Sequence, residues 1–189
     1  RSSYAFRKYI QAGLDELRRL GTPIAERTFE LICTGGIKID ELSDLSKKDF
    51  EHLRKEFARD GIELAAGDFY KLHDGRTKVS RAIRQSIDGY MWDNRIYVAK
   101  GLSPKQLAVT LAHEVNHVLN ESEENYRSKK AILLEEYRAH LVEKMTLGVP
   151  ITPELCKEIK EYVIDAYGLQ PLTADDVPDD PPGVFEEEE

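Results

Sequence analysis

Residues 107 to 120, LAVTLAHEVNHVLN, restrict the possible folds of this chain more than any other stretch. Ser103 followed by Pro104 predicts that a helix begins just before it. Apolar residues recur around that helix, so we expect it to be buried on more than one side. Residues four apart lie on one face of a helix, so His113 and His117 can direct their imidazole nitrogens at one point in space.

Two imidazole nitrogens at one point suit a zinc ion, which takes neutral imidazole at about 2.0 to 2.1 Å and prefers four tetrahedral ligands. Glu114 follows the first histidine and is rotated by about 100° around the helix, so its carboxylate can reach the open side of the ion without occupying it. There it can accept a proton from water, as a zinc hydrolase requires. The alternative is a helix with two core histidines, each of which needs a buried partner or costs about 1 to 3 kcal/mol.

A zinc site needs a third protein ligand, and the next predicted helix offers several candidates. Its sequence ILLEEYRAHLVEK contains four side chains that can bind a metal, namely Glu135, Glu136, His140 and Glu143. Adjacent glutamates such as Glu135 and Glu136 more often form the solvated face of an ordinary helix. The spacing of the apolar residues in this helix argues against that alternative only in part. Glu136 lies near an edge between the two apolar stripes of this helix.

The HEVNH motif followed by a glutamate-bearing helix resembles the gluzincin group of zinc metallopeptidases, over roughly residues 90 to 147. In that group the third ligand is a glutamate about eighteen to twenty residues beyond the second histidine, followed by alanine three positions later. The resemblance implies that Glu136, in the sequence EYRA, is this ligand of a single Zn²⁺ ion. Glu135 and His140 are the alternatives. Many members of the group carry an aspartate where this chain has His140, and that aspartate hydrogen-bonds the first histidine; His140 can do the same or bind the metal itself.

The resemblance implies a zinc-dependent endopeptidase that hydrolyses peptide bonds of a protein substrate, with Glu114 as the general base. In such enzymes the strand before the active-site helix is commonly a sheet edge, so RIYVA at 95 to 99 is expected to hydrogen-bond an extended peptide. The alternative is an ordinary paired strand with Ile96 and Val98 facing the core. An additional donor to the substrate oxygen is usual, and the candidates are Tyr90, Tyr97, Tyr126 and Tyr137.

Two other functions fit the same residues. One is a zincin-scaffold module that has lost catalysis and binds a protein partner, although a purely structural site has no need for Glu114. The other is a zinc hydrolase that acts on a non-peptide bond. The compact chain, without a recognisable accessory domain, also suggests an effector or toxin domain delivered into another cell.

The whole pattern predicts an α+β protein with a zincin-like fold, mostly helical, with a small antiparallel sheet beside the active-site helix. A hairpin is expected at about 89–92 and 95–99 because Asp93 and Asn94 separate two aromatic and β-branched runs. Helices are expected within the segments 3–21, 22–36 and 46–61, from 103 onward through the HEVNH motif, and at about 131–147 and 152–168, and residues 62–86 fit helix or strand equally. The predicted division is a helical region at 1–60, a catalytic domain at 61–170 and an acidic disordered tail at 171–189.

Charge restricts the partners of this chain. The net charge of −8 arises from residues 173–189, which carry eight acidic side chains and no basic one, whereas the rest balances 27 basic against 27 acidic residues. A neutral body with an anionic tail disfavours nucleic acid, although the tail could contact a protein partner. No apolar run approaches the ~20 residues of a membrane span, and the first twenty residues lack the apolar block of a signal peptide, so the compartment stays undetermined.

Overall fold

The computed structural model describes residues 3–42, 69–71, 77–79, 89–92, 94–120, 125 and 127–184 of the chain. The predicted helix at 46–61 and most of the segment 62–86 lie outside these residues. Within that segment, β2 (Phe69–Lys71) and β3 (Thr77–Val79) pair as antiparallel strands.

The helices begin where short polar side chains cap them, as the sequence predicts. Thr22, Ser103 and Thr152 each accept a backbone N–H from the first turn, and each is followed by a proline. Gln106 completes the predicted capping box on Ser103. The helices are α1 (Tyr4–Leu20), α2 (Pro23–Thr34), α5 (Pro104–Leu119), α6 (Lys129–Thr146) and α7 (Pro153–Ala166), with a short 3₁₀ helix η4 (Ala174–Asp176). Among the described helices, none is long and apolar enough to cross a membrane.

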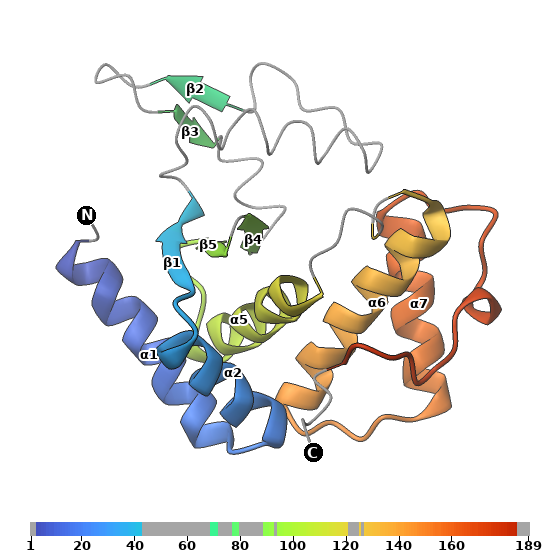
Figure 1. Ribbon diagram of the computed structural model, residues 1–189, viewed down its shortest axis with the longest axis horizontal. Helices are drawn as coiled ribbons and strands as arrows, with labels where there is room; N and C mark the ends of the chain where they lie inside the picture. Colours follow the sequence, from blue (N-terminus) through green and yellow to red (C-terminus); the bar gives the residue numbers. More distant parts are fainter. Residues whose placement is uncertain are drawn as a thin grey trace.

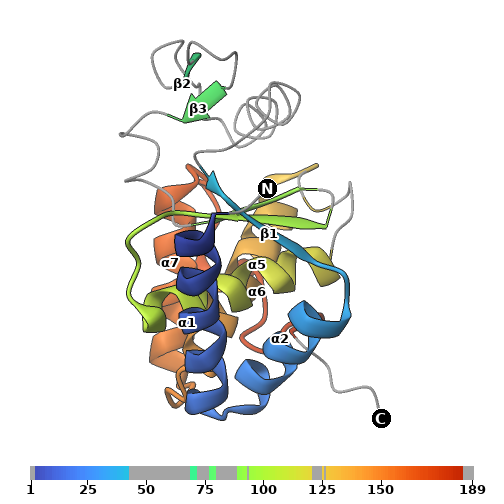
Figure 2. The same cartoon turned by 90° about the vertical axis from the view of Figure 1, so that its left-hand side faces the viewer.

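A three-stranded sheet lies beside α5, and its strand β1 (Lys38–Glu41) is labelled in Figure 2. The strand order is β1, β5 (Arg95–Val98), β4 (Gly89–Trp92). The antiparallel β4–β5 hairpin confirms the prediction at 89–92 and 95–99. Two other predictions are wrong. The sheet is mixed and not antiparallel, because β1 runs parallel to β5. The region before residue 60 is therefore not wholly helical, since β1 lies within it.

The predicted location of the sheet edge is also wrong. β5 is the central strand, hydrogen-bonded to β1 on one side and to β4 on the other, and so has no free backbone edge. Ile96, Tyr97 and Val98 are buried. The alternative of a paired, core-facing strand is therefore correct, and among the described strands β4 forms the edge on the side away from β1.

Helix α5 lies between two parts of the core. On one side it shares a hydrophobic cluster with α1, α2 and β5, which includes Leu17, Ile32, Ile96, Leu107 and Leu111. On the other side it packs along α6, and α6 shares a second cluster with α7. Figure 1 shows α5 between the blue helices α1 and α2 and the orange helices α6 and α7. The expected burial of this helix on more than one side is confirmed.

The prediction of disorder for the tail is wrong for residues 171–184, which we call the C-terminal strap. The Tyr137 hydroxyl donates to the Asp179 carbonyl (2.6 Å), and the buried Lys160 ammonium donates to the Asp179 carboxylate (2.6 Å). Val177 is buried in the α6–α7 cluster, and Val184 packs against this cluster. Val184 also packs against a small third cluster formed by Ile24, Ala112 and Val142. Apolar residues spaced between the acidic ones, and a buried cation opposite them, order the segment.

Candidate metal centre

The facing sides of α5 and α6 bring together three of the predicted metal ligands. His113 Nε2 and His117 Nε2 lie 3.0 Å apart. Glu136 on α6 approaches both, with Oε2 3.8 Å from His113 Nε2 and Oε1 3.5 Å from His117 Nε2. His117 and Glu136 are buried, and His113 is nearly so. Two residues one helical turn apart on α5 and one residue on α6 thus converge on one point, as the spacing predicts.

The separations of these atoms fit a zinc ion. Ligands at about 2.0 to 2.1 Å from a tetrahedral zinc ion lie about 3.3 Å from one another. The separation of 3.0 Å between the two Nε2 atoms, and those of 3.5 and 3.8 Å from them to the two different oxygens of Glu136, bracket that value. Two imidazole nitrogens and one carboxylate oxygen are also a donor set that zinc prefers.

Carboxylates behind the two histidines fix which nitrogen faces the centre. His113 Nδ1 lies 2.7 Å from Glu143 Oε2, and His117 Nδ1 lies 2.9 Å from Glu135 Oε1. An ionised carboxylate can only accept, so both Nδ1 atoms carry a proton; when both rings are neutral, as metal binding requires, both Nε2 atoms present a lone pair. Glu135, the alternative third ligand, therefore supports His117 from behind and does not line the centre.

Glu143 has the role that the sequence assigned to His140. In the resembled group an aspartate four residues after the ligand glutamate bonds the first histidine, but here a glutamate seven residues after Glu136 does so. Glu143 also accepts a bond from His140 Nδ1 (2.9 Å), so one carboxylate oxygen holds two histidine rings. Helical spacing gives the missed signal, because residues three, four and seven apart share a face.

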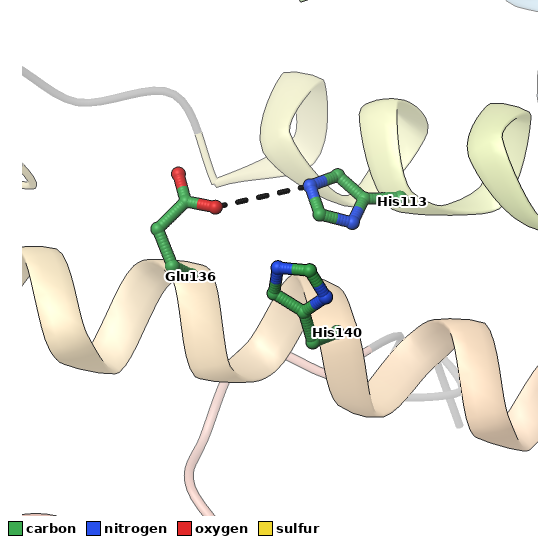
Figure 3. Close-up of side chains that lie close together, drawn as sticks. All are labelled: His113, Glu136 and His140. Atoms are coloured by element: carbon green, nitrogen blue, oxygen red, sulfur yellow. Dashed lines mark ion pairs between the residues drawn. The ribbon is translucent and has the colours of Figure 1, made fainter. Parts of the chain in front are cut away.

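His140 itself lies at the rim of the centre. Its ring is edge-on to the His113 ring, with 4.8 Å between the ring centres. One potential ligand atom from each of His113, Glu136 and His140 lies within 4.8 Å of the other two. Figure 3 shows a ring nitrogen of His140 facing the space between His113 and Glu136.

A buried ion pair connects Glu135 with the C-terminal strap. The guanidinium of Arg138 hydrogen-bonds Glu135 Oε2 through Nη2 and donates to the Pro182 carbonyl through Nη1 (2.9 Å). Asn120 at the end of α5 donates to the next carbonyl, that of Gly183 (2.8 Å). The strap is thus linked to His117, a predicted ligand, through two intervening side chains, Arg138 and Glu135.

The electrostatic field of the site favours a cation. Burial alone raises the pKa of Glu136, but His117 and His113 outweigh it and lower the pKa to about 2. Burial lowers the pKa of His117, yet Glu136 and Glu135 outweigh it and hold the pKa well above its usual range. The pKa of Glu143 is likewise lowered, because its histidine partners outweigh burial. The carboxylates of Glu136 and Glu143 therefore stay ionised beside the histidine rings and attract positive charge.

The Glu114 side chain lies on the side of α5 that faces β4. It is 5% exposed, and burial raises the pKa of its carboxyl group. Its side chain lies against Gly89 of β4, where an added Cβ would meet Thr110 Cγ2 at 2.8 Å and Glu114 Oε1 at 3.2 Å. The close approach of β4 to α5 therefore requires glycine at this position.

A tyrosine reaches the centre, but it is not one of the four predicted. The Tyr167 hydroxyl, at the end of α7, donates to Glu136 Oε2 (3.0 Å). Tyr97 is buried in the core, and the Tyr137 hydroxyl bonds the strap. The side chains of Tyr90 and Tyr126 lie outside the described part of the chain. No sequence spacing identifies Tyr167, because the packing of α7 on α6 places it there.

No family model, curated protein or solved structure matches the chain. The functional interpretation therefore depends on the residues of this centre and their geometry.

Proposed function

We propose that the protein is a zinc-dependent metallopeptidase of the zincin type, in which His113, His117 and Glu136 bind one Zn²⁺ ion and Glu114 is the general base. The observation that carries this proposal is the convergence of the two Nε2 atoms and the Glu136 carboxylate within 3.0 to 3.8 Å of one another. A zincin-like fold is part of the proposal: α5 supplies two ligands, α6 supplies the third, and a mixed sheet lies beside α5.

The surroundings of Glu114 suit proton transfer. When bound, zinc polarises a carbonyl group and lowers the pKa of water from 15.7 to about 7. Burial raises the pKa of Glu114, which makes this carboxylate a better proton acceptor near neutral pH. It takes the proton of the attacking water at a carboxylate oxygen and delivers it to the departing amine nitrogen.

The position of β4 supports a polypeptide substrate. β4 is the edge of the described three-stranded sheet, and Gly89 brings its backbone against the Glu114 side chain. An extended peptide that pairs with an edge strand presents its carbonyl groups at regular intervals along that strand. The edge strand β4 thus takes the role that the sequence assigned to residues 95–99. A non-peptide substrate has no corresponding use for this edge.

A zinc-binding scaffold without catalysis is the second candidate. His140 offers a further nitrogen at the same centre, and four protein ligands are typical of structural zinc sites. The buried carboxylate of Glu114 favours the enzyme, because a structural site needs no general base.

The test is to measure bound zinc and cleavage of a peptide library by the wild type and by Glu114→Gln. We expect one zinc ion per chain in both proteins, and activity about 10² to 10⁴ times lower in the variant. Glu158→Gln, on the exposed face of α7, is the matched control and should behave as the wild type. A wild type that binds zinc but cleaves nothing would favour the scaffold, and full activity in Glu114→Gln would exclude the proposed base.

A further inference from the structure

His140 is held at the metal centre by two neighbours. Its Nδ1 lies 2.9 Å from Glu143 Oε2, and its ring is edge-on to the ring of Tyr162, with 5.4 Å between the ring centres. The side chain of His140 is 23% exposed, and Tyr162 is 60% exposed. The ring is therefore oriented by specific contacts but is not enclosed by the core.

The bonding pattern of His140 matches that of the two proposed ligands. In all three histidines Nδ1 faces a carboxylate, Glu143 for His113 and His140, and Glu135 for His117. Metal-binding histidines characteristically donate the other ring N–H to such a partner. The pattern leaves a lone pair on Nε2 of His140, and the ring presents a nitrogen to the space between His113 and Glu136 (Figure 3).

The distance that His140 must close is small. Its nearest ligand atom lies within 4.8 Å of those of His113 and Glu136, compared with about 3.3 Å between the ligands of a tetrahedral zinc ion. A shift of about 1.5 Å would bring it to that spacing from His113 and Glu136, within the reach of a change in side-chain torsion angles. The exposed Tyr162 leaves room for it.

We propose that His140 Nε2 is a fourth ligand of the bound metal ion, so that the resting centre is closed and the attacking water must displace His140 to reach it. This inference rests on the proposed function, because it concerns the same ion. It also explains why a histidine stands where the resembled peptidases carry an aspartate. That aspartate only orients the first histidine, a task that Glu143 performs here, so position 140 is released for a ligand.

Histidine-selective ¹⁵N NMR of the full chain during zinc titration tests the inference. The chain has five histidines. In the wild type we expect the Nε2 resonances of three histidines, His113, His117 and His140, to shift in slow exchange. In His140→Ala we expect the two remaining resonances to shift. We also expect that variant to bind zinc about 10 to 100 times more weakly, and its Co²⁺ form to show a changed visible spectrum. Tyr162→Phe touches the same ring without altering a candidate ligand and should match the wild type.

Each other outcome has a separate meaning. If only two histidines shift, and His140→Ala keeps the wild-type zinc affinity and Co²⁺ spectrum, His140 is not a ligand and the inference fails while the proposed zinc site stands. If the wild type binds no zinc, the proposed function fails as well. Circular dichroism of His140→Ala separates either result from a failure to fold.

Discussion

Replacing Glu135 with glutamine perturbs the support of the metal centre without touching its ligands. The Glu135 carboxylate is 1% exposed and accepts from His117 Nδ1 through one oxygen and from Arg138 through the other. A glutamine of the same shape keeps one acceptor oxygen but presents an N–H₂ group to the second partner. The N–H₂ group of the glutamine then faces a second buried donor, either His117 Nδ1–H or the Arg138 guanidinium.

The structure sets the size of both expected effects. Removing one partner of a buried ion pair costs about 3 to 5 kcal/mol, and the remaining hydrogen bond of the glutamine offsets part of it, so we expect a loss of about 2 to 4 kcal/mol in the free energy of unfolding. Loss of a carboxylate behind a metal-binding histidine typically weakens metal affinity by about 10 to 100 times, or about 1.4 to 2.8 kcal/mol. Glu135→Gln is therefore expected to lower both quantities.

Two measurements separate these effects. Urea unfolding in the presence of a chelator reports the stability of the metal-free protein, and competition with a chromophoric chelator reports the zinc affinity. Glu158→Gln again supplies the control, since it makes the same chemical change at an exposed position. If Glu135→Gln matched this control in both experiments, the pair with Arg138 would carry no stability and the bond to His117 would not support the ligand.

Three further predictions concern other parts of the site. Gly89→Ala adds a Cβ that displaces the Glu114 side chain, so we expect kcat to fall about 10²-fold while the zinc content stays unchanged. An unchanged kcat would refute the close approach of Gly89 to Glu114. Gly183 has φ +88°, and a Cβ there would lie 2.6 Å from Arg138 Nη1. Gly183→Ala should therefore lower the free energy of unfolding in urea by about 1 to 3 kcal/mol. If the variant were as stable as the wild type, the strap would not hold Arg138 in place. Burial lowers the pKa of His117, but surrounding carboxylates outweigh it and raise the pKa, so protons compete with zinc. As the pH falls below this raised pKa, the zinc Kd should weaken by about tenfold per pH unit for each proton displaced. Calorimetric titration at several pH values checks this, and a Kd independent of pH would contradict it.

Local signals allowed the helices and the hairpin to be predicted. Caps such as Thr22 and Thr152 act within one turn, and the turn at Asn94, which has a positive φ of 58°, joins strands that are adjacent in sequence. Strand β1 carries no such signal. It has four residues, three of them charged, and its partner β5 lies far along the chain. A parallel pairing of this kind depends on tertiary packing.

The same contrast holds within the candidate site. Spacing along one helix placed His113 and His117 together, and the resemblance indicated Glu136. Helical spacing places Glu143 on the same face of α6 as Glu136 and His140, but its contact with His113 depends on how α6 packs against α5. The role of Tyr167 depends on how α7 packs against α6, which no pattern within one helix contains.

Composition misled the interpretation of the C-terminal strap. Acidic and proline-rich segments usually fail to bury enough apolar surface to fold. Here a single buried cation changes the result, because Lys160 donates to the Ala174 and Val177 carbonyls and to the Asp179 carboxylate. The partner of the strap belongs to α7 and is invisible in the sequence of the strap itself.

A crystal structure of the zinc-loaded protein, with anomalous data collected at the zinc edge, tests the central claim most directly. The account predicts one strong anomalous peak about 2.0 to 2.2 Å from His113 Nε2, His117 Nε2 and a Glu136 carboxylate oxygen. A peak bound by other side chains, or no peak between α5 and α6 at saturating zinc, would contradict it.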